Sequence, residues 1–580
     1  MCGFFGLVSQ DSINLEKAKK SLEILNHRGP DNSSFKIEEN IFIGHKRLSI
    51  IDLSESGNQP MTSKDNSVIL VFNGEIYNFN LLRKELQSCG VSFQSHSDTE
   101  VILKGYLEWG FDKIISKLNG MFAISIVDKN KECIFLARDH AGIKPLFFSN
   151  QHNNFIFSSE LNPINKYLGI NSNENLDYSA LYDFLTYLYI PTPKTAFMHI
   201  KKLEPGHIIK FNYKTKKMTK TKYWELDLYE NNYEENDLLE ELEDRLVKTI
   251  SMEQVSDVPI GYFLSGGIDS GLVSSIGSSI NDSEPNTYSI YFDNPIFDES
   301  GLINKTKEHI KSNHTFRYVN ENDIKMLLNK GQTWFGEPFG DVSYMPTHLV
   351  SELASKDLKV VLTGDGGDEV FGGYERFLYV SKNMQMKIPK LDFLKNSELS
   401  KTLNNRDIFS RIYKKLRFDF ALNPLEMYTI LMNGMLKEEK IEYKEKFNIP
   451  DDYDDYWYFR KFYKADLPIL KRLQYLDFKT YLVDDNLTKV DRASMRSSIE
   501  CRVPLLNKDL VNFVFSIKTS LIWKNNQKKF LLKEIAKKYL PNEILNAKKK
   551  GFSIPSYEWI VKPSSRKNLG EVILDNFLKL

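Results

Sequence analysis

The stretch PIGYFLSGGIDSGLVSSIGSSI, residues 259–280, decides the fold of the longer part of this chain. Residues 259–264 are apolar and predict a short strand, residues 265–270 form a glycine-rich loop, and residues 271–280 predict a helix of small residues. The same rhythm of strand, helix and glycine-rich turn returns at 287–292, 349–355, 359–362 and 363–373. This alternation predicts a doubly wound parallel sheet, with ligands at the carboxyl ends of its strands.

The N-terminal part of the chain predicts strands that pair antiparallel. Short apolar or alternating segments are bounded by turn residues at 67–72, 121–127, 133–138 and 154–157. Residues 128–131 separate two of these segments like a hairpin loop, and residues 99–109 predict a helix. We therefore expect an antiparallel sheet domain with some helix.

Two further segments connect or follow these parts. The acidic, Asn-rich residues 224–246 predict a linker that runs into a solvated helix. Residues 379–480 are aromatic, rich in Lys and poor in Gly, which favours helices.

Composition excludes several classes of protein. A chain of 580 residues predicts about two to four domains. Lys and Arg together number 77, as do Asp and Glu, so no basic excess points to nucleic acid. We expect no membrane span and no secretion leader. With no CxxC or HExxH pattern, a zinc site is not expected. The chain holds few cysteines for its length, which fits a reducing cytoplasm rather than a disulfide framework: Cys2, Cys89, Cys133 and Cys501.

Cys2 follows the initiator Met, where removal of that Met is expected. Removal would place a thiol, with a pKa of about 8.5, beside an α-amine with a pKa of about 7.7–8.0. One residue could then supply both nucleophile and base, as an N-terminal Thr does. The alternative is a small buried cysteine.

Polar residues elsewhere in this part could assist Cys2. Arg47 could clamp a carboxylate, and Asp98 could hold an ammonium group. Asn73 and Gly74, which follow the segment 67–72, could form an oxyanion hole. The alternatives are a surface ion pair, a turn and, for Asp98, the N-cap of the helix at 99–109.

The loop SGGIDS, residues 265–270, could bind phosphate, because successive amides at a helix N-terminus attract anions. Asp269 could hold magnesium against that phosphate. No GxxxxGK[ST] motif is present, and Glu369 interrupts a possible GxGxxG pattern. The alternative for such a loop is a plain tight turn.

The N-terminal motifs MCGFFGLV, LNHRGPD, GHKRLSIID, NGEIYN and SDTEVIL resemble, in this order, the class II glutamine amidotransferase domain. The resemblance implies an N-terminal-nucleophile fold of two sheets between helices. It implies that Cys2 attacks the glutamine carboxamide, giving a thioester and ammonia, and that Asn73 and Gly74 stabilise the oxyanion. The implied glutamine-binding residues are Arg47, Leu48, Ser49, Ile50, Ile51, Asn73, Gly74, Glu75 and Asp98.

The later motifs SGGIDS, TGDGGDEVFGGY, DDNLTKVDRASMRSSIECRVPLL, KKFLLKEIAKKYLP and KKKGFSIP resemble glutamine-hydrolysing asparagine synthetases and, in the first loop, ATP pyrophosphatases. The resemblance implies ATP as substrate and Mg²⁺, with Asp269 and Asp368 as metal ligands. Asp365 would assist ammonia attack and Lys529 would bind pyrophosphate, although by itself Lys529 reads as one charge on a Lys-rich helix. The implied ATP-binding residues are Leu264, Ser265, Gly266, Gly267, Asp269, Ser270, Ile290, Thr363 and Gly364.

Four features depart from the family's pattern. Asp365 replaces a common Glu, Tyr291 replaces a small residue, and Asn507 replaces a common Asp. The segment GEPFGDVSYMPTH, residues 336–348, resembles a branch that includes surface-polysaccharide amidotransferases. The acceptor is therefore aspartate or another carboxylate, such as a uronic acid.

The full expectation is an α+β N-terminal-nucleophile hydrolase sandwich (αββα) over residues 1–215, then an α/β doubly wound ATP-pyrophosphatase domain with added helices over 216–580. Glutamine, ATP and a carboxylate would be small-molecule substrates in the cytoplasm, with ammonia passing through an apolar tunnel. Neither nucleic acid nor a membrane is an expected partner. Family members are often dimers, which makes a homodimer one expectation. The rival hypothesis is a catalytically idle protein that keeps the fold.

Overall fold

The computed structural model describes residues 2–151, 153–170, 175–281, 284–385, 416, 418, 422–547, 554, 559, 560 and 568–579. Apart from Ile554, the motif KKKGFSIP lies outside these residues, as does most of the interval 386–421. Within the described ranges, no helix has both the length and the apolar character that crossing a bilayer requires.

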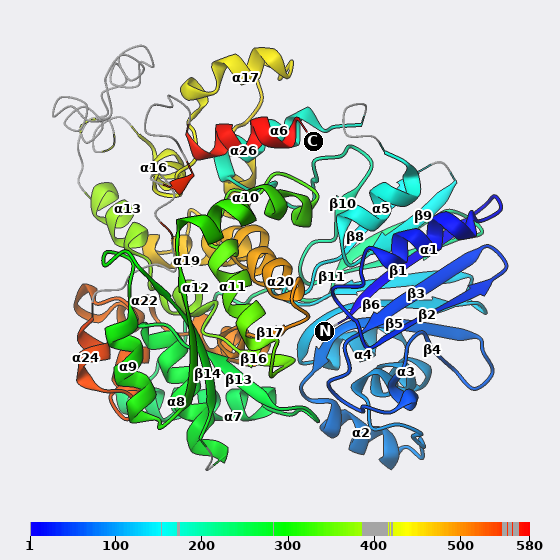
Figure 1. The fold of residues 1–580 in the computed structure, drawn as a ribbon, viewed down its shortest axis with the longest axis horizontal. Helices are drawn as coiled ribbons and strands as arrows, with labels where there is room; N and C mark the ends of the chain where they lie inside the picture. Colours follow the sequence, from blue (N-terminus) through cyan, green and yellow to red (C-terminus); the bar gives the residue numbers. More distant parts are fainter. Residues whose placement is uncertain are drawn as a thin grey trace.

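Two antiparallel sheets, each of six strands in the described part of the chain, form the N-terminal unit (Figure 1). The first has the order β10-β8-β9-β1-β3-β2, with bounds β1 Gly3–Ser9, β2 Asn32–Glu38, β3 Ile41–Arg47, β8 Phe147–Gln151, β9 Asn154–Ser158 and β10 Lys201–Lys202. The second has the order β12-β11-β7-β6-β5-β4, with bounds β4 Met61–Thr62, β5 Val68–Ile76, β6 Gly120–Asp128, β7 Cys133–Arg138, β11 His207–Asn212 and β12 Met218–Lys222.

The sheets stack face to face and helices cover their outer faces. Phe4 and Phe157 of the first sheet share a buried core with Val71 of the second. The outer face of the first sheet packs against α1 Leu15–Glu23, α5 Leu161–Leu168 and α6 Tyr178–Tyr187, and that of the second against α2 Phe79–Ser88, α3 Asp98–Trp109 and α4 Phe111–Lys117. These four layers confirm the predicted αββα sandwich.

A parallel sheet organises the rest of the molecule. In the described residues it has five strands in the order β15-β14-β13-β16-β17, with bounds β13 Ile260–Phe263, β14 Asn286–Phe292, β15 Asn313–Val319, β16 Val360–Leu362 and β17 Glu500–Arg502. The chain order reverses between β13 and β16, which is where doubly wound sheets bind ligands. The predicted doubly wound sheet is therefore confirmed.

Helices surround this sheet and cover part of the first unit. They are α7 Glu235–Glu253, α8 Ile268–Asn281, α9 Ser300–His309, α10 Glu321–Phe335, α11 Tyr344–Ala354, α12 Gly367–Phe371, α13 Glu375–Gln385, α16 Pro424–Leu431, α17 Ile441–Lys446, α18 Trp457–Phe462, α19 Ile469–Lys479, α20 Leu487–Met495, α21 Lys508–Phe515, α22 Thr519–Ile522, α23 Phe530–Ala536, α24 Asn542–Asn546 and α26 Leu569–Phe577. A π-helical turn, η4 Leu482–Asn486, leads directly into α20. The helices predicted within 379–480 are confirmed where that segment is described.

Several local expectations change in the structure. The strand predicted at 67–72 continues to Ile76, so Asn73 and Gly74 lie inside β5 rather than after it. The helix predicted to be solvated, α7, instead buries an apolar stripe that includes Leu238, Leu242 and Leu246. Beyond residue 215, β12 still pairs with β11.

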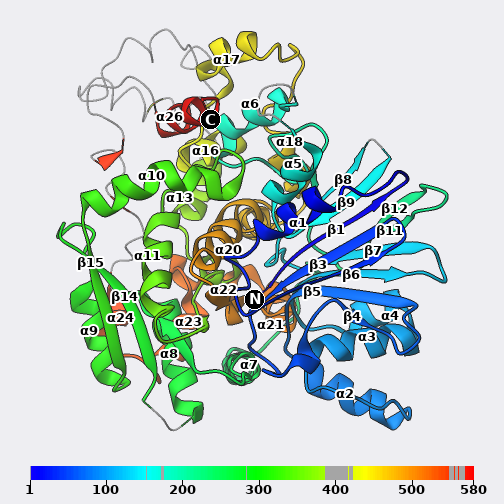
Figure 2. The same cartoon turned by 45° about the vertical axis from the view of Figure 1, so that its right-hand side comes forward.

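One helix lies where the two units meet. Figure 2 shows α20 between α11 and the strands of the first sheet around β1. Because α20 follows η4 and precedes β17, the segment 482–502 runs along this interface and ends in the parallel sheet.

Candidate active sites

Cys2 lies directly before β1 and is buried. Its backbone nitrogen donates to Asn73 Oδ1 over 3.0 Å. The other atom of that amide, Nδ2, is buried and finds no hydrogen-bond partner among the described residues. Burial raises the pKa of the Cys2 thiol above its ordinary value. A cysteine thus lies beside an amide donor that remains available to a ligand.

Gly74 occupies a position that only glycine fits. Its φ is +149°, and a Cβ there would lie 1.9 Å from the carbonyl oxygen of Met121 on the neighbouring strand. The close approach of β5 and β6 therefore requires the absence of a side chain beside Asn73.

Arg47 holds the loop that follows β3. Its guanidinium donates to the carbonyl of Ser54 at 2.8 Å, to Asn58 Oδ1 at 2.9 Å and to the carbonyl of Ile51 at 3.3 Å. These contacts order the segment that carries the predicted glutamine-binding residues Leu48, Ser49, Ile50 and Ile51. In the structure Arg47 is thus satisfied by the loop, and its role as a carboxylate clamp stays a prediction.

Asp98 is the first residue of α3, and Ser97, not Asp98, is the N-cap. The Asp98 carboxylate accepts from the backbone nitrogen of Ile76 over 3.0 Å, and burial raises its pKa to about 6. Glu75, also buried, lies 3.6 Å from Arg502 Nη2 of the parallel sheet. Burial and the nearby carboxylates of Glu500 and Asp98 raise the pKa of Glu75. Both carboxyl groups are therefore buried in the same unit as Cys2, and among the ion pairs of the described residues Arg502 is the partner of Glu75, while Asp98 has none.

The loop 265–270 closes at the end of β13. Ser265 and Ser270 join their hydroxyls over 2.8 Å, and Ser270 Oγ also accepts from the backbone nitrogen of Ser265 over 3.1 Å. The backbone nitrogen of Gly266 donates to a carboxylate oxygen of Glu299 over 3.1 Å. A negatively charged group thus already contacts this loop, as expected of a site that suits anions.

The glycine-rich turn after β16 packs tightly on this loop. A Cβ at Gly364 would lie 2.5 Å from the Ser270 nitrogen, and one at Gly367 would lie 2.7 Å from Asp269 Cγ. The predicted pyrophosphate loop and the turn after β16 therefore meet at the switch point of the sheet. Of the residues predicted to lie around AMP, Leu264 follows β13, Thr363 and Gly364 follow β16, and Ile290 lies on the neighbouring strand β14.

Tyr291, the departure noted in the β14 motif, is buried in a small cluster with Leu264 and Ile303. Its ring stacks on Phe316 with centroids 4.4 Å apart. The large side chain is thus accommodated against the edge strand β15.

Lys529 brings the two loops together. Its Nζ lies 2.7 Å from Asp368 Oδ1 and also contacts Asp269 Oδ2. Asp269 Oδ1 is buried and makes no hydrogen bond within the described part of the chain. Lys529 precedes α23 with a φ of +52°, so it is not a residue of a solvated helix. Two converging carboxylates with an open oxygen fit Mg²⁺ shared with phosphate, since Mg²⁺ usually takes one or two carboxylates.

Asp365 accepts from the Thr363 hydroxyl over 2.8 Å. A buried lysine that sequence reasoning missed, Lys489 of α20, lies 3.5 Å from Asp341. Burial lowers the pKa of Lys489, but Asp341 and Asp365 outweigh it and raise that pKa. The motif containing Lys489 was visible in the sequence, but its ion pair with Asp341 was not.

Comparison with known proteins places the chain in a family. Residues 1–224 match the glutamine amidotransferase domain family, and residues 241–579 match the asparagine synthase family. The chain is 30% identical over 571 residues to asparagine synthetase [glutamine-hydrolyzing] 1 of Bacillus subtilis, covering 97% of this chain and 88% of that protein. It is 36% identical over 522 residues to putative asparagine synthetase [glutamine-hydrolyzing] 2 of Methanocaldococcus jannaschii, covering 85% of this chain and 98% of that protein.

The fold and these matches define a glutamine amidotransferase joined to an ATP-using synthetase. The chain belongs to the family of glutamine-hydrolysing asparagine synthetases, ligases that amidate a substrate with glutamine nitrogen.

Proposed function

We propose that this enzyme makes asparagine from aspartate, with glutamine as nitrogen donor and ATP as the source of activation. The observation that carries the proposal is the pair of preformed sites: Cys2 beside the open amide of Asn73, and Lys529 between Asp269 and Asp368. The names of relatives that align over most of the chain support aspartate as the acceptor.

In the first site, Cys2 supplies both nucleophile and base. After removal of Met1, its nitrogen, oriented by Asn73 Oδ1, accepts the thiol proton while Sγ attacks the glutamine carboxamide carbon. The oxyanion accepts hydrogen bonds from Asn73 Nδ2 and the Gly74 N–H. The intermediate releases ammonia with the proton from the amine, and water then hydrolyses the glutamyl thioester. Glu75 and Asp98 hold the substrate ammonium.

Ammonia then crosses between the units. A cavity of about 20 Å³ lies at the interface, which is room for about one water-sized molecule. The cavity is lined by apolar and charged side chains, whereas the sequence predicted an apolar tunnel. The lining includes Ile143, Leu146, Phe335, Arg138, Lys202 and Glu337. We propose that ammonia passes through this cavity on its way between the two sites.

In the second site, the aspartate β-carboxylate attacks the α-phosphorus of ATP, and the bond to pyrophosphate breaks. The amides of loop 265–270 and Lys529 bind the pyrophosphate. Asp269 and Asp368 would hold Mg²⁺, which would supply positive charge to neutralise the phosphates. Ammonia nitrogen then attacks the acyl carbon, Asp365 accepts a proton, and AMP leaves as asparagine forms.

We propose a boundary between the two units that lies between β12 and α7, because β12 completes the second sheet of the first unit.

We also propose that the protein is located in the cytoplasm. All four cysteines are free and three are buried, which supports this location.

Product analysis tests the proposal. The enzyme is incubated with glutamine, ATP and Mg²⁺, with and without aspartate, and glutamate, asparagine and AMP are quantified together. Asparagine and AMP should rise in step only when aspartate is present. If glutamate is released but AMP formation does not depend on aspartate, the acceptor should be sought among sugar carboxylates. If neither glutamate nor AMP forms, the hypothesis of a catalytically idle protein would be favoured.

The Cys2→Ala variant separates the two sites. It should lose glutamate release and glutamine-dependent synthesis but keep synthesis from ammonium, because Cys2 takes no part in adenylation. Loss of ammonium-dependent synthesis in this variant would contradict the proposed separation.

A further inference from the structure

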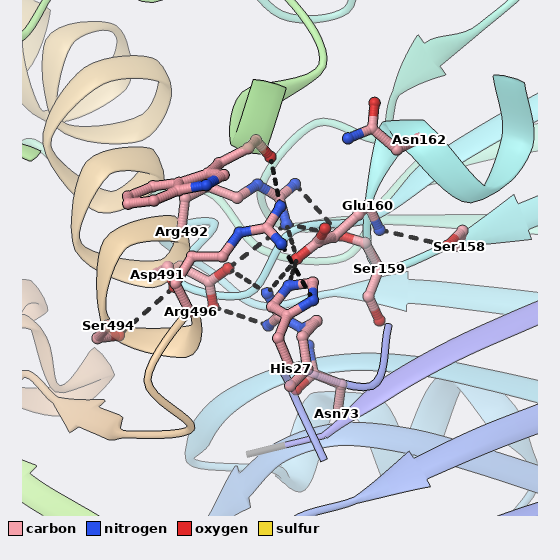
Figure 3. A network of polar contacts seen from close by, with 12 residues as sticks. His27, Asn73, Ser158, Ser159, Glu160, Asn162, Asp491, Arg492, Ser494 and Arg496 are labelled. Carbon is pink, nitrogen blue, oxygen red and sulfur yellow. Dashed lines mark hydrogen bonds and ion pairs between the residues drawn. The ribbon is translucent and has the colours of Figure 1, made fainter. Parts of the chain in front are cut away.

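A buried arginine links the backbone of Cys2 to the synthetase unit. Arg28 is fully buried, and its Nε donates to the carbonyl oxygen of Cys2 over 3.0 Å. Its two terminal nitrogens meet the two carboxylate oxygens of Asp491 on α20 at 2.8 and 3.0 Å. Figure 3 shows Asp491 projecting from α20 into this network. The Cys2 backbone is therefore held from both sides, by Asn73 at its nitrogen and by Arg28 at its oxygen.

Asp491 accepts two hydrogen bonds from Arg28, whereas Glu160 accepts one. The other nearby carboxylate, Glu160, shares its Oε1 with Arg28, Arg492 and His27, each at 3.0 Å. Arg492 lies 3.7 Å from Asp491, farther than Arg28 does. Without the Asp491 charge, Arg28 would keep its contact with Glu160 Oε1, which it shares with Arg492 and His27.

The same interface segment contacts the glutamine site a second time. Arg502, at the end of β17, lies 3.6 Å from Glu75, and its carbonyl accepts from the Thr363 nitrogen over 2.9 Å. The segment 482–502 thus contacts the glutamine side at two points and the adenylation turn at another.

We propose that Asp491 is a positioning residue for the glutaminase, acting through Arg28 on the main chain of Cys2. The glutaminase site is then completed by a side chain of the synthetase unit. This inference rests on the proposed role of Cys2 as nucleophile. Because the contact fixes the Cys2 carbonyl rather than the glutamine ammonium, it acts on the rate of attack more than on substrate binding.

The variant Asp491→Asn tests this role, since Asn keeps the shape but loses the charge and one acceptor atom. We expect the glutaminase kcat to fall between about 10-fold and about 100-fold, because a misplacement of about 1 Å can cost that much. The KM for glutamine should change less, and ammonium-dependent AMP formation should stay at the wild-type rate. The matched control is Asp509→Asn, an interface carboxylate that accepts from Asn119 Nδ2 over 2.9 Å and should behave as wild type.

A double-mutant cycle shows whether Asp491 acts through Arg28. Arg28→Lys keeps the charge but cannot reach Cys2 and both Asp491 oxygens together, so it should lower kcat similarly. The double variant should be no slower than the slower single variant. The proposal would be overturned if the fold-losses of kcat in the two single variants multiply in the double variant. It would also be overturned if Asp491→Asn leaves the glutaminase kcat unchanged, or lowers ammonium-dependent synthesis by the same factor. A wild-type enzyme that releases no glutamate would instead overturn the proposed role of Cys2, and this inference with it.

Discussion

Asn73 shows at the scale of one residue how the first site is prepared. One amide atom is occupied by the Cys2 nitrogen, and the other is buried with no partner among the described residues. Because an unsatisfied buried donor is costly, its retention favours a ligand oxygen as the missing acceptor.

Replacing Asn73 with Ala should therefore lower the glutaminase kcat by about 100-fold to 1,000-fold, with a smaller change in the KM for glutamine. Steady-state glutamate release measures both constants. Asn212→Ala, which alters a turn at the end of β11, is the control and should leave kcat unchanged. A fall confined to KM would contradict the oxyanion role.

The proposed contact of Asp98 with the glutamine ammonium predicts a pH dependence for glutamine binding, because burial raises the pKa of Asp98 to about 6. Only the ionised carboxylate can hold the substrate ammonium, so the KM for glutamine should rise as pH falls through about 6. The rise should approach tenfold per unit well below that pKa. Measurements between about pH 5 and pH 8 test this, with Asp98→Asn expected to show a high KM that varies little with pH. A wild-type KM independent of pH would count against this role of Asp98.

At the scale of elements, the second site depends on two turns that meet where the sheet order reverses. Gly364 after β16 approaches the backbone of Ser270 so closely that a Cβ would lie 2.5 Å from its nitrogen. The glycines therefore serve packing between the loops as well as any approach of phosphate.

Gly364→Ala should push the loops apart and raise the KM for ATP by about tenfold or more, corresponding to at least 1.4 kcal/mol of binding. Glutaminase activity should be retained. Gly301→Ala in α9 is the matched control, because a Cβ there meets nothing within 4 Å. Aspartate-dependent AMP formation at varied ATP concentration gives the comparison, and equal behaviour of the two variants would refute the prediction.

At the scale of the whole molecule, buried charges join the two units. Arg502 is fully buried, lies 2.8 Å from Glu500 and 3.6 Å from Glu75, and donates to the carbonyls of Glu253 and Val255. Since these carboxylates are themselves buried, Arg502 offsets the charge of Glu500 in its own unit and that of Glu75 in the other unit.

Arg502→Met should destabilise the folded protein by about 3–5 kcal/mol, because it leaves buried carboxylates without their partner. Urea unfolding followed by circular dichroism measures the change. Lys524→Met, which removes a partly exposed ion pair with Glu235, should cost less than about 1 kcal/mol. Similar shifts in the two variants would show that the buried contact contributes little.

Local sequence patterns were sufficient to predict many of the strands and helices of this molecule. Alternation and turn residues placed β7 at Cys133–Arg138, and the rhythm around residues 259–280 predicted the parallel sheet. The prediction that α7 is solvated was wrong for one face of the helix. Its repeated Leu residues form a buried stripe, which the high content of charged residues did not indicate. The extent of β5 was also missed, since Asn73 and Gly74 resemble a turn when their neighbours on β6 are unknown.

The sequence by itself determined the two fold classes, the family and the candidate nucleophile, because these follow from residue types and spacings within short segments of the chain. Only the tertiary structure decided that Arg28 joins Cys2 to Asp491, which lies 463 residues beyond Arg28 in the chain. It also decided that Lys489 pairs with Asp341 and that Arg502 of the same segment lies beside Glu75. Such contacts depend on how the two units pack together, and no local pattern of residues encodes the partner of a buried charge.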